Sequence, residues 1–237
     1  MRQTHAAPKA SDYELHVPFI IWTSDGYGKQ YPGILKTLII LEILYTIKHR
    51  QGIDMIKKKQ RQTEYFNPND ILACRALSTR ISDFLADSGQ PSDSTVVLCI
   101  GTDRATGDAL GPLTGSFLTE HNCPFKVYGT LKAPVHALNL RDTIHHIYDL
   151  FVSPAIIAVD ASLGRPSDVG MITLSNAPLY PGIGVNKKLP AIGDISITGI
   201  VNLSGKPGMS LLQSTRLYTV SNMARFISDA ILSSSTH

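Results

Sequence analysis

The stretch TVVLCIGTDRATGDALGP, residues 95–112, decides the fold of this 237-residue chain. Its first six residues, Thr95–Ile100, are almost continuously apolar, which is typical of a strand buried on both faces. A polar loop, Gly101–Asp108, follows directly, and apolar residues then recur at helical spacing. The stretch therefore predicts a strand, a loop and a helix, which is the repeating unit of an α/β fold.

The same alternation continues along the rest of the chain. Further strands are predicted at residues 125–129, 155–160, 169–174 and 194–201. Helices are predicted at residues 74–85, 110–118, 140–150 and 217–231, each with one apolar face. We therefore expect a three-layer α/β/α fold with a mostly parallel sheet.

Composition bounds the class of protein. Apolar residues make up 43% and charged residues 17% of the chain, as in ordinary globular proteins. No run of about 18 apolar residues occurs, so no membrane association is expected. The three cysteines are odd in number and lack the spacing of a zinc site, which argues against a disulfide scaffold. This cysteine usage favours a reducing compartment, so we expect a cytoplasmic protein.

Residues 1–62 differ from the rest in charge and in pattern. They carry ten Lys and Arg against five Asp and Glu, whereas residues 63–237 carry twelve against fourteen. Because the body is slightly acidic, we expect no nucleic-acid partner. The apolar run Ile34–Ile47 contains Lys36 and Glu42 and suits a short helix. We expect an N-terminal extension at 1–62, poorly structured or a loosely packed helix, before an α/β/α domain at 63–237.

Acidic residues lie near the carboxyl ends of two predicted buried strands. In sheets of this kind, ligands bind beyond those ends, which would place 102–108, 132–136 and 160–164 along one crevice. Asp108 and Asp160 could there share a proton or hold a metal ion. The alternative is that Asp108 caps the following helix and Asp160 orders a turn.

Two further segments are candidates for the same crevice. His136 follows the second strand and is either a hydrogen-bonded structural residue, a metal ligand or a proton shuttle. The segment 181–188 contains Gly182 and Gly184 before Lys187 and Lys188. It predicts either a flap with a cationic tip or a surface hairpin.

Several motifs, taken in order, resemble those of the YyaC-like sporulation proteins. They are LCIGTD at 98–103, GDALGP at 107–112, AVDA at 158–161, PGIGV at 181–185 and DISITGIV at 194–201. This family is related to the spore germination proteases and, more distantly, to the hydrogenase maturation endopeptidases. The resemblance covers about residues 66–233 and leaves residues 1–54 outside.

The resemblance implies a peptidase (phosphorylase/hydrolase)-like fold and an aspartic-type endopeptidase. Asp108 and Asp160 match the catalytic aspartates of the germination proteases, and no cofactor is then expected. Thr102, Asp103, Gly182, Gly184 and Lys187 are expected to bind the substrate. That substrate would be a protein, with the small acid-soluble spore proteins as the class that the resemblance suggests. The location would be the forespore or mother cell of a spore-forming bacterium.

Two alternatives stay open at this point. One is a non-catalytic binding or regulatory protein of sporulation on the same fold. The other is a metal-dependent peptidase that holds a divalent ion with Asp108, Asp160 and His136. The histidine that the maturation endopeptidases carry after the second aspartate is missing here, because the only later histidine is His237. A homo-oligomer is compatible with each of these functions.

The composition break near Met55 leads to a first prediction. A variant that begins at Met55, which is itself a plausible natural start, should unfold cooperatively near the melting temperature of the full chain. The physical reason is that residues 1–54 carry none of the motifs and little regular pattern. Thermal unfolding followed by circular dichroism measures this. A loss of several kcal/mol, or of solubility, would show instead that Ile34–Ile47 packs on the core.

Overall fold

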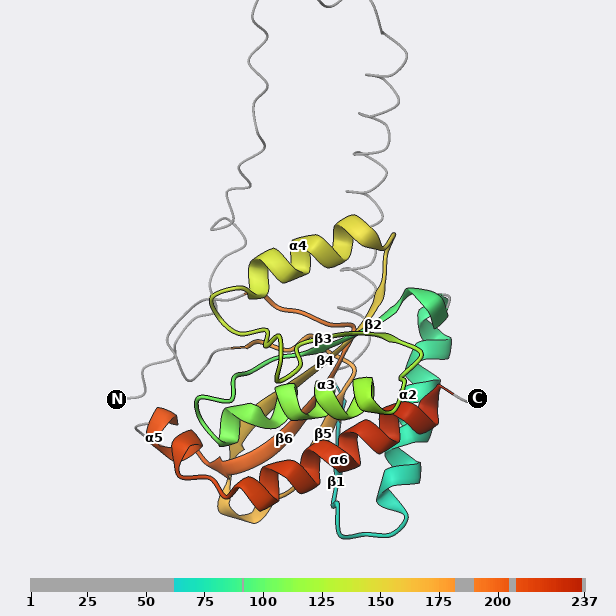
Figure 1. The fold of residues 1–237 in the computed structure, drawn as a ribbon. Helices are drawn as coiled ribbons and strands as arrows, with labels where there is room; N and C mark the ends of the chain where they lie inside the picture. The colour runs from blue at the N-terminus through green and yellow to red at the C-terminus, as the bar shows by residue number, and fades with distance from the viewer. Residues whose placement is uncertain (1–61, 91, 182–189, 205–207, 236–237) are drawn as a thin grey trace, which may run out of the picture. The chain divides into compact units, whose positions relative to one another are not determined.

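A computed structural model of the protein describes residues 62–90, 92–181, 190–204 and 208–235 (Figure 1). The predictions about residues 1–61, and those about Gly182, Gly184 and Lys187, lie outside these ranges. Of the helices that the structure describes, none has the length and apolar character that crossing a bilayer requires.

The described part of the chain forms one six-stranded sheet with the order β1-β5-β6-β4-β2-β3. The strands are β1 (Thr63–Phe66), β2 (Thr95–Cys99), β3 (Lys126–Tyr128), β4 (Ala155–Gly164), β5 (Ile172–Ser175) and β6 (Ile195–Leu203). β3, β2, β4 and β6 are parallel, whereas β5 runs antiparallel to both β6 and β1. The expectation of an α/β fold with a mostly parallel sheet is therefore confirmed.

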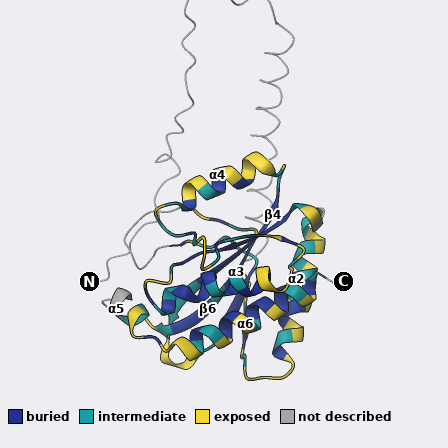
Figure 2. Cartoon of the chain, viewed as in Figure 1, coloured by how far each residue is buried: buried dark blue, intermediate teal, exposed yellow. Residues whose placement is uncertain are grey.

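Helices cover both faces of the sheet (Figure 1). On one face lie α2 (Ala73–Ser88), α3 (Leu110–Glu120) and α6 (Leu217–Ser234), and on the other lies α4 (Leu140–Leu150). The short helix α5 (Gly208–Gln213) precedes α6. Figure 2 shows that β4 and β6 are largely buried, while α4 keeps one exposed side.

The two faces build two separate apolar cores. Val97 and Cys99 of β2 face the core beneath α2, α3 and α6, whereas Val96 and Leu98 face the core beneath α4. Successive side chains of a strand point to opposite faces, so a strand covered on both faces must be apolar at every position. This is the physical reason for the uninterrupted apolar run at the start of residues 95–112.

The structure corrects the sequence-based elements in three places. β4 does not end at Asp160 but continues to Gly164, because β6 offers backbone partners as far as Leu203, across a register shift at Ser162. Residues 160–164 are therefore strand and not the expected loop. β5 begins only at Ile172, after a 3₁₀ turn at 166–168. The edge strand β1 and the helix α5 were not predicted, because each is too short to show a period.

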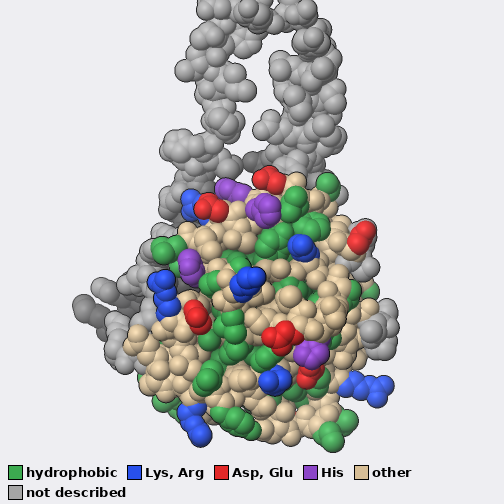
Figure 3. Space-filling view, in the orientation of Figure 1, with side chains coloured by type: hydrophobic (Ala, Val, Ile, Leu, Met, Phe, Trp, Pro, Cys, Tyr) green, Lys and Arg blue, Asp and Glu red, His purple; other side chains and the backbone are tan. Residues whose placement is uncertain are grey.

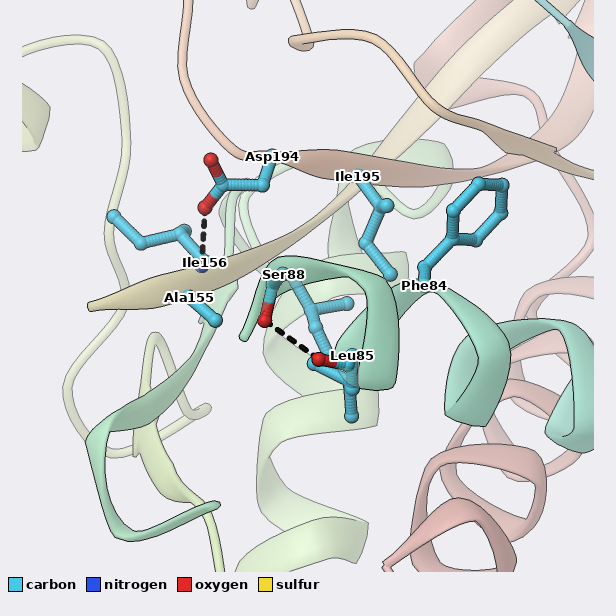
Figure 4. Close-up of a pocket in the computed structure, with 8 residues that line it drawn as sticks. Phe84, Leu85, Ser88, Ala155, Ile156, Asp194 and Ile195 are labelled. Atoms are coloured by element: carbon cyan, nitrogen blue, oxygen red, sulfur yellow. Dashed lines mark hydrogen bonds between the residues drawn. The ribbon is translucent and has the colours of Figure 1, made fainter. Parts of the chain in front are cut away.

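The amino ends of β4 and β6 are joined by two hydrogen bonds, of which Figure 4 shows the one that the side chain of Asp194 accepts. The backbone N–H of Asp194 donates to the carbonyl oxygen of Ile156 at 2.8 Å, and the N–H of Ile156 donates to Asp194 Oδ2 at 2.8 Å. A cavity of about 10 Å³, the size of one water, lies beside them against Phe84 and Leu85. Asp194 therefore fixes where β6 starts relative to β4.

This arrangement predicts the stability of two Asp194 variants. Asp194→Ala should lower the free energy of unfolding by about 1–3 kcal/mol, because the N–H of the buried Ile156 loses its acceptor. Asp194→Asn keeps a side-chain oxygen at the same place and should lose clearly less. Urea denaturation measures both values. An alanine variant as stable as the parent protein would contradict the assigned role.

Candidate active site

A step in the sheet creates the candidate site. β2 ends at Cys99, whereas its neighbour β4 continues past Val159 to Gly164. The last contact between the two is a hydrogen bond from the N–H of Ile100 to the carbonyl oxygen of Val159, at 2.7 Å. Asp160 is the next residue of β4, with 8% of its surface exposed. It therefore lies in the gap that the shorter strand leaves.

The loop after β2 brings Asp108 into this region. The N–H of Thr102 donates to the carbonyl oxygen of Asp108 at 3.1 Å and to its Oδ2 at 3.0 Å. Gly101 has a φ of 140°, and a Cβ there would collide with the Asp108 carbonyl oxygen. Only glycine permits the loop to turn this tightly.

The helix that follows is equally close to the strand. A Cβ at Gly111, in the first turn of α3, would collide with the carbonyl oxygen of Ile100. The 3₁₀ turn Gly107–Ala109 leads directly into α3, with no side-chain cap. The expectation that Asp108 caps this helix is therefore wrong, because its carboxylate accepts from Thr102 of the loop.

The two carboxyl groups act on each other electrostatically. Burial is the main cause that raises the pKa of Asp160 well above its ordinary value. The charge of Asp108 raises it further, while a hydrogen bond of 2.8 Å from the N–H of Ala161 opposes the rise. That bond to the adjacent residue occurs within β4, so Asp160 does not order a turn as the alternative supposed.

The pKa of Asp108 is shifted by causes that oppose one another. Burial raises its pKa, while the hydrogen bond from Thr102 and the charge of His136 lower it. Among the described residues, neither aspartate forms an ion pair with a lysine or arginine. Two acids that act on each other in this way resist the loss of both protons, because the charge of Asp108 disfavours the ionised form of Asp160. Such a pair can supply an acid and a base together.

His136 lies on the Asp108 side of the pair. Its backbone N–H donates to Asn139 Oδ1 at 2.7 Å, and its Nδ1 accepts from the N–H of Leu138 at 3.4 Å. These contacts hold the histidine at the start of α4, and its charge reaches Asp108. Within the described ranges, however, no three His, Cys, Asp or Glu side chains are placed to hold a metal ion together.

Of the expected substrate-binding residues, Thr102 lies against Asp108, whereas Asp103 is exposed. Thr102 contacts Asp108 through its backbone, and its hydroxyl lies 3.5 Å from Asp103 Oδ1. The side chain of Asp103 is exposed at the tip of the loop. Thr102 thus orients the carboxylate of Asp108, whereas Asp103 is free to meet a ligand.

The sequence patterns missed a row of hydroxyl groups beside Asp160. Thr198 of β6 is the register partner of Asp160. Its Oγ1 lies 2.8 Å from Thr173 Oγ1 of β5 and accepts from Ser162 Oγ at 3.1 Å. Threonine is common in strands, so only the pairing of β4, β6 and β5 reveals this row. It gives the site a polar floor on the side away from β2.

Comparison with known proteins was made for the sequence and for the structure. A family model described as "Protein of unknown function (DUF1256)" matches residues 65–230. The "Uncharacterized protein YyaC" of Bacillus subtilis (strain 168) is 44% identical over 185 residues, which are 77% of this chain and 88% of that protein. The resemblance that the motifs indicated is thus confirmed.

A solved structure is also similar. It is the [NiFe] hydrogenase maturation protease HycI from Thermococcus kodakarensis KOD1, with a TM-score of 0.37 and 16% identity. The match covers 64% of this chain and 98% of that one. A likeness of this size transfers no activity.

The family match extends over most of the chain. It includes both aspartates and, apart from the first residues of β1, all six strands. The chain belongs to the DUF1256 family.

Proposed function

We propose that this protein is an endopeptidase of the aspartic type, in which Asp108 and Asp160 act together on a water molecule. The observation that carries the proposal is that the charge of the half-buried Asp108 acts on the buried carboxyl group of Asp160, while neither forms an ion pair with a lysine or arginine in the described structure. Burying such a pair destabilises a fold, and strongly shifted carboxyl groups are concentrated at functional sites. The step between β2 and β4 also leaves the pair at the sheet edge where ligands of α/β folds bind.

The surroundings of the two groups assign their roles. Asp160 is the more deeply buried, so it is the group that keeps the proton and acts as the acid. Asp108 accepts the N–H of Thr102 and lies within reach of the His136 charge, and both favour its ionised form. It therefore acts as the base.

A balanced reaction follows from these roles. Asp108 takes a proton from water while the water oxygen forms a bond to the carbonyl carbon of the peptide. Asp160 donates its proton to the carbonyl oxygen. When the tetrahedral intermediate collapses, the C–N bond breaks, the proton on Asp108 goes to the departing amine, and the hydroxyl proton returns to Asp160. One water is consumed, and both carboxyl groups regain their starting states.

The finer biological assignment rests on the motif resemblance. The motifs that resemble those of the YyaC-like sporulation proteins support a role in sporulation, and the relation of that family to the spore germination proteases suggests small acid-soluble spore proteins as the substrate. A metal-dependent reaction is the second candidate, and the observation that favours it is the proximity of His136 to Asp108. In that case, Asp108, Asp160 and His136 would need to move together around the ion.

The roles predict the kinetics of two variants. Asp108→Asn and Asp160→Asn should each lower the rate of cleavage of a small acid-soluble spore protein by about 100-fold or more, because each loses a group that transfers a proton. The double variant should be no slower than the worse single variant, since one loss already disables the pair. Cleavage is followed by mass spectrometry of the products.

The matched control is Asp93→Asn, which removes an exposed carboxylate from a 3₁₀ turn outside the site. It should cleave at the parent rate. Exhaustive chelation should also leave the parent rate unchanged. Activity that chelator removes and a divalent ion restores would assign the metal-dependent alternative. A parent protein that cleaves no peptide would instead favour the binding protein.

The raised pKa of Asp160 predicts how stability depends on pH. Below the ordinary value of 3.8, Asp160 is protonated in both the folded and the unfolded chain, and its contribution to stability is fully present. As pH rises towards the higher folded pKa, the folded state binds more protons than the unfolded state, so the free energy of unfolding falls. Asp160→Asn cannot ionise, so its stability should fall less than that of the parent protein as pH rises above the ordinary value of 3.8 towards the higher folded pKa.

Urea denaturation at a series of pH values, with parent protein, Asp160→Asn and Asp93→Asn in parallel, measures these slopes. Asp93→Asn should follow the parent protein. If Asp160→Asn also had the same slope as the parent protein, Asp160 would not be a buried acid with a raised pKa. The shared-proton site would then be excluded, whatever the activity of the protein.

A further inference from the structure

An open groove of about 680 Å³ lies between α4 and the chain segment that contains β3. Its walls include Tyr128 of β3, Pro134 and His136 of the following loop, and Asp142, Thr143 and His146 of α4. Figure 3 shows histidine and acidic side chains gathered over α4 on the face that it draws. The volume suits one large side chain or a short peptide segment.

The groove is joined to the aspartate pair by backbone contacts. Val135 lines the groove, and its carbonyl oxygen accepts from the N–H of Gly101 at 2.8 Å. The next residue, Thr102, is the one that binds Asp108. His136 also lines the groove, one residue beyond Val135. A chain that crosses the aspartate pair would therefore lie directly beside the groove.

One polar group in the wall lacks a partner. The hydroxyl of Tyr128 is buried and forms no hydrogen bond, alone among the buried side-chain polar atoms of the described ranges. The ring of Tyr128 meets the ring of His146 edge to face, with centroids 6.1 Å apart and an interplanar angle of 79°. His146 is exposed, and both rings line the groove. A buried hydroxyl without a partner is costly, and a bound donor would pair it.

The chemistry of the walls favours a cation. The carboxylate of Asp142 is the permanent charge among the described lining residues, which include no lysine or arginine. Aromatic faces next to a carboxylate attract ammonium and guanidinium groups. Part of the wall is apolar, with Val127, Pro134 and Val135, and this part suits the methylene stem of a long basic side chain.

We propose that this groove binds a lysine or arginine side chain of the polypeptide that reaches the aspartate pair. The stem packs on the apolar wall, and the cationic tip lies between the carboxylate of Asp142 and the ring and hydroxyl of Tyr128. That the bound chain is then cleaved rests on the proposed function, whereas the recognition of the basic side chain does not.

The test measures binding to the full-length protein without any cleavage. The probes are N-acetyl-arginine N-methylamide and its citrulline counterpart, which has nearly the same shape and no charge. Arginine should bind with a dissociation constant on the order of 1 mM, as expected for so small a ligand. Citrulline should bind roughly fivefold more weakly. Titrations followed by NMR measure both values and show whether the signals of Tyr128 and His146 shift.

Two matched variants assign the effect to the groove. Asp142→Asn should weaken arginine binding about three- to fivefold, as for a partly exposed charge pair, and leave citrulline binding nearly unchanged. Asp149→Asn removes an equal charge from the same helix outside the groove and should bind arginine as the parent protein does. Tyr128→Phe should fold and should bind arginine more weakly, because the bound guanidinium group loses the tyrosine hydroxyl as a hydrogen-bond acceptor.

The outcomes separate this inference from the proposed function. Equal affinities for arginine and citrulline, equal effects of Asp142→Asn and Asp149→Asn, or no binding of arginine at about 50 mM would each overturn the inference. Selective arginine binding by a protein that cleaves no peptide would support the groove and count against the peptidase. Cleavage with no preference for basic side chains would support the peptidase and count against the groove.

Discussion

The parallel pairing of β4 with strands of unequal length is the constraint on which the rest of the structure depends. β4 pairs with β2 only as far as Val159, but with β6 as far as Gly164. Every buried backbone group must find a partner, so the chain cannot leave the unpaired side of β4 open. The loop between β2 and α3 approaches that side, and it carries Asp108 towards Asp160. The site is thus a consequence of where one strand ends.

Placing two acids in this gap opposes folding, and the two apolar cores offset that cost. Asp160 belongs to β4, and the two residues before it in this strand, Ala158 and Val159, are fully buried in opposite cores. A rigid sheet of this kind cannot relax around a charge, so the carboxyl group responds by holding its proton. The same burial that disfavours the ionised form thereby favours the protonated acid that the proposed reaction needs. Stability and the proposed chemistry are linked through one side chain.

A single excursion of the chain serves both the aspartate pair and the groove. The chain leaves the edge strand β3 after Tyr128 and returns to the end of β2 at Val135, which forms an isolated bridge with Ile100. Along the way it forms one wall of the groove, and at its return it holds Gly101 next to the Asp108 loop. This segment therefore connects the groove at α4 to the loop that contains Thr102 through backbone contacts.

The sequence by itself determined the layers of this protein and the residues at the ends of its strands. Continuous apolar runs such as Thr95–Ile100 are typical of strands covered on both faces, and the 3–4 spacing in 140–150 and 217–231 indicates helices that bury one face. Local patterns of this kind predicted α4 with its observed ends and placed Asp108 and Asp160 at one edge of the sheet. Only the tertiary structure decided how far β4 runs, which hydroxyl groups flank Asp160, and that Tyr128 and Asp142 share a groove. These features depend on pairing and packing between segments distant in sequence, and no local period encodes such contacts.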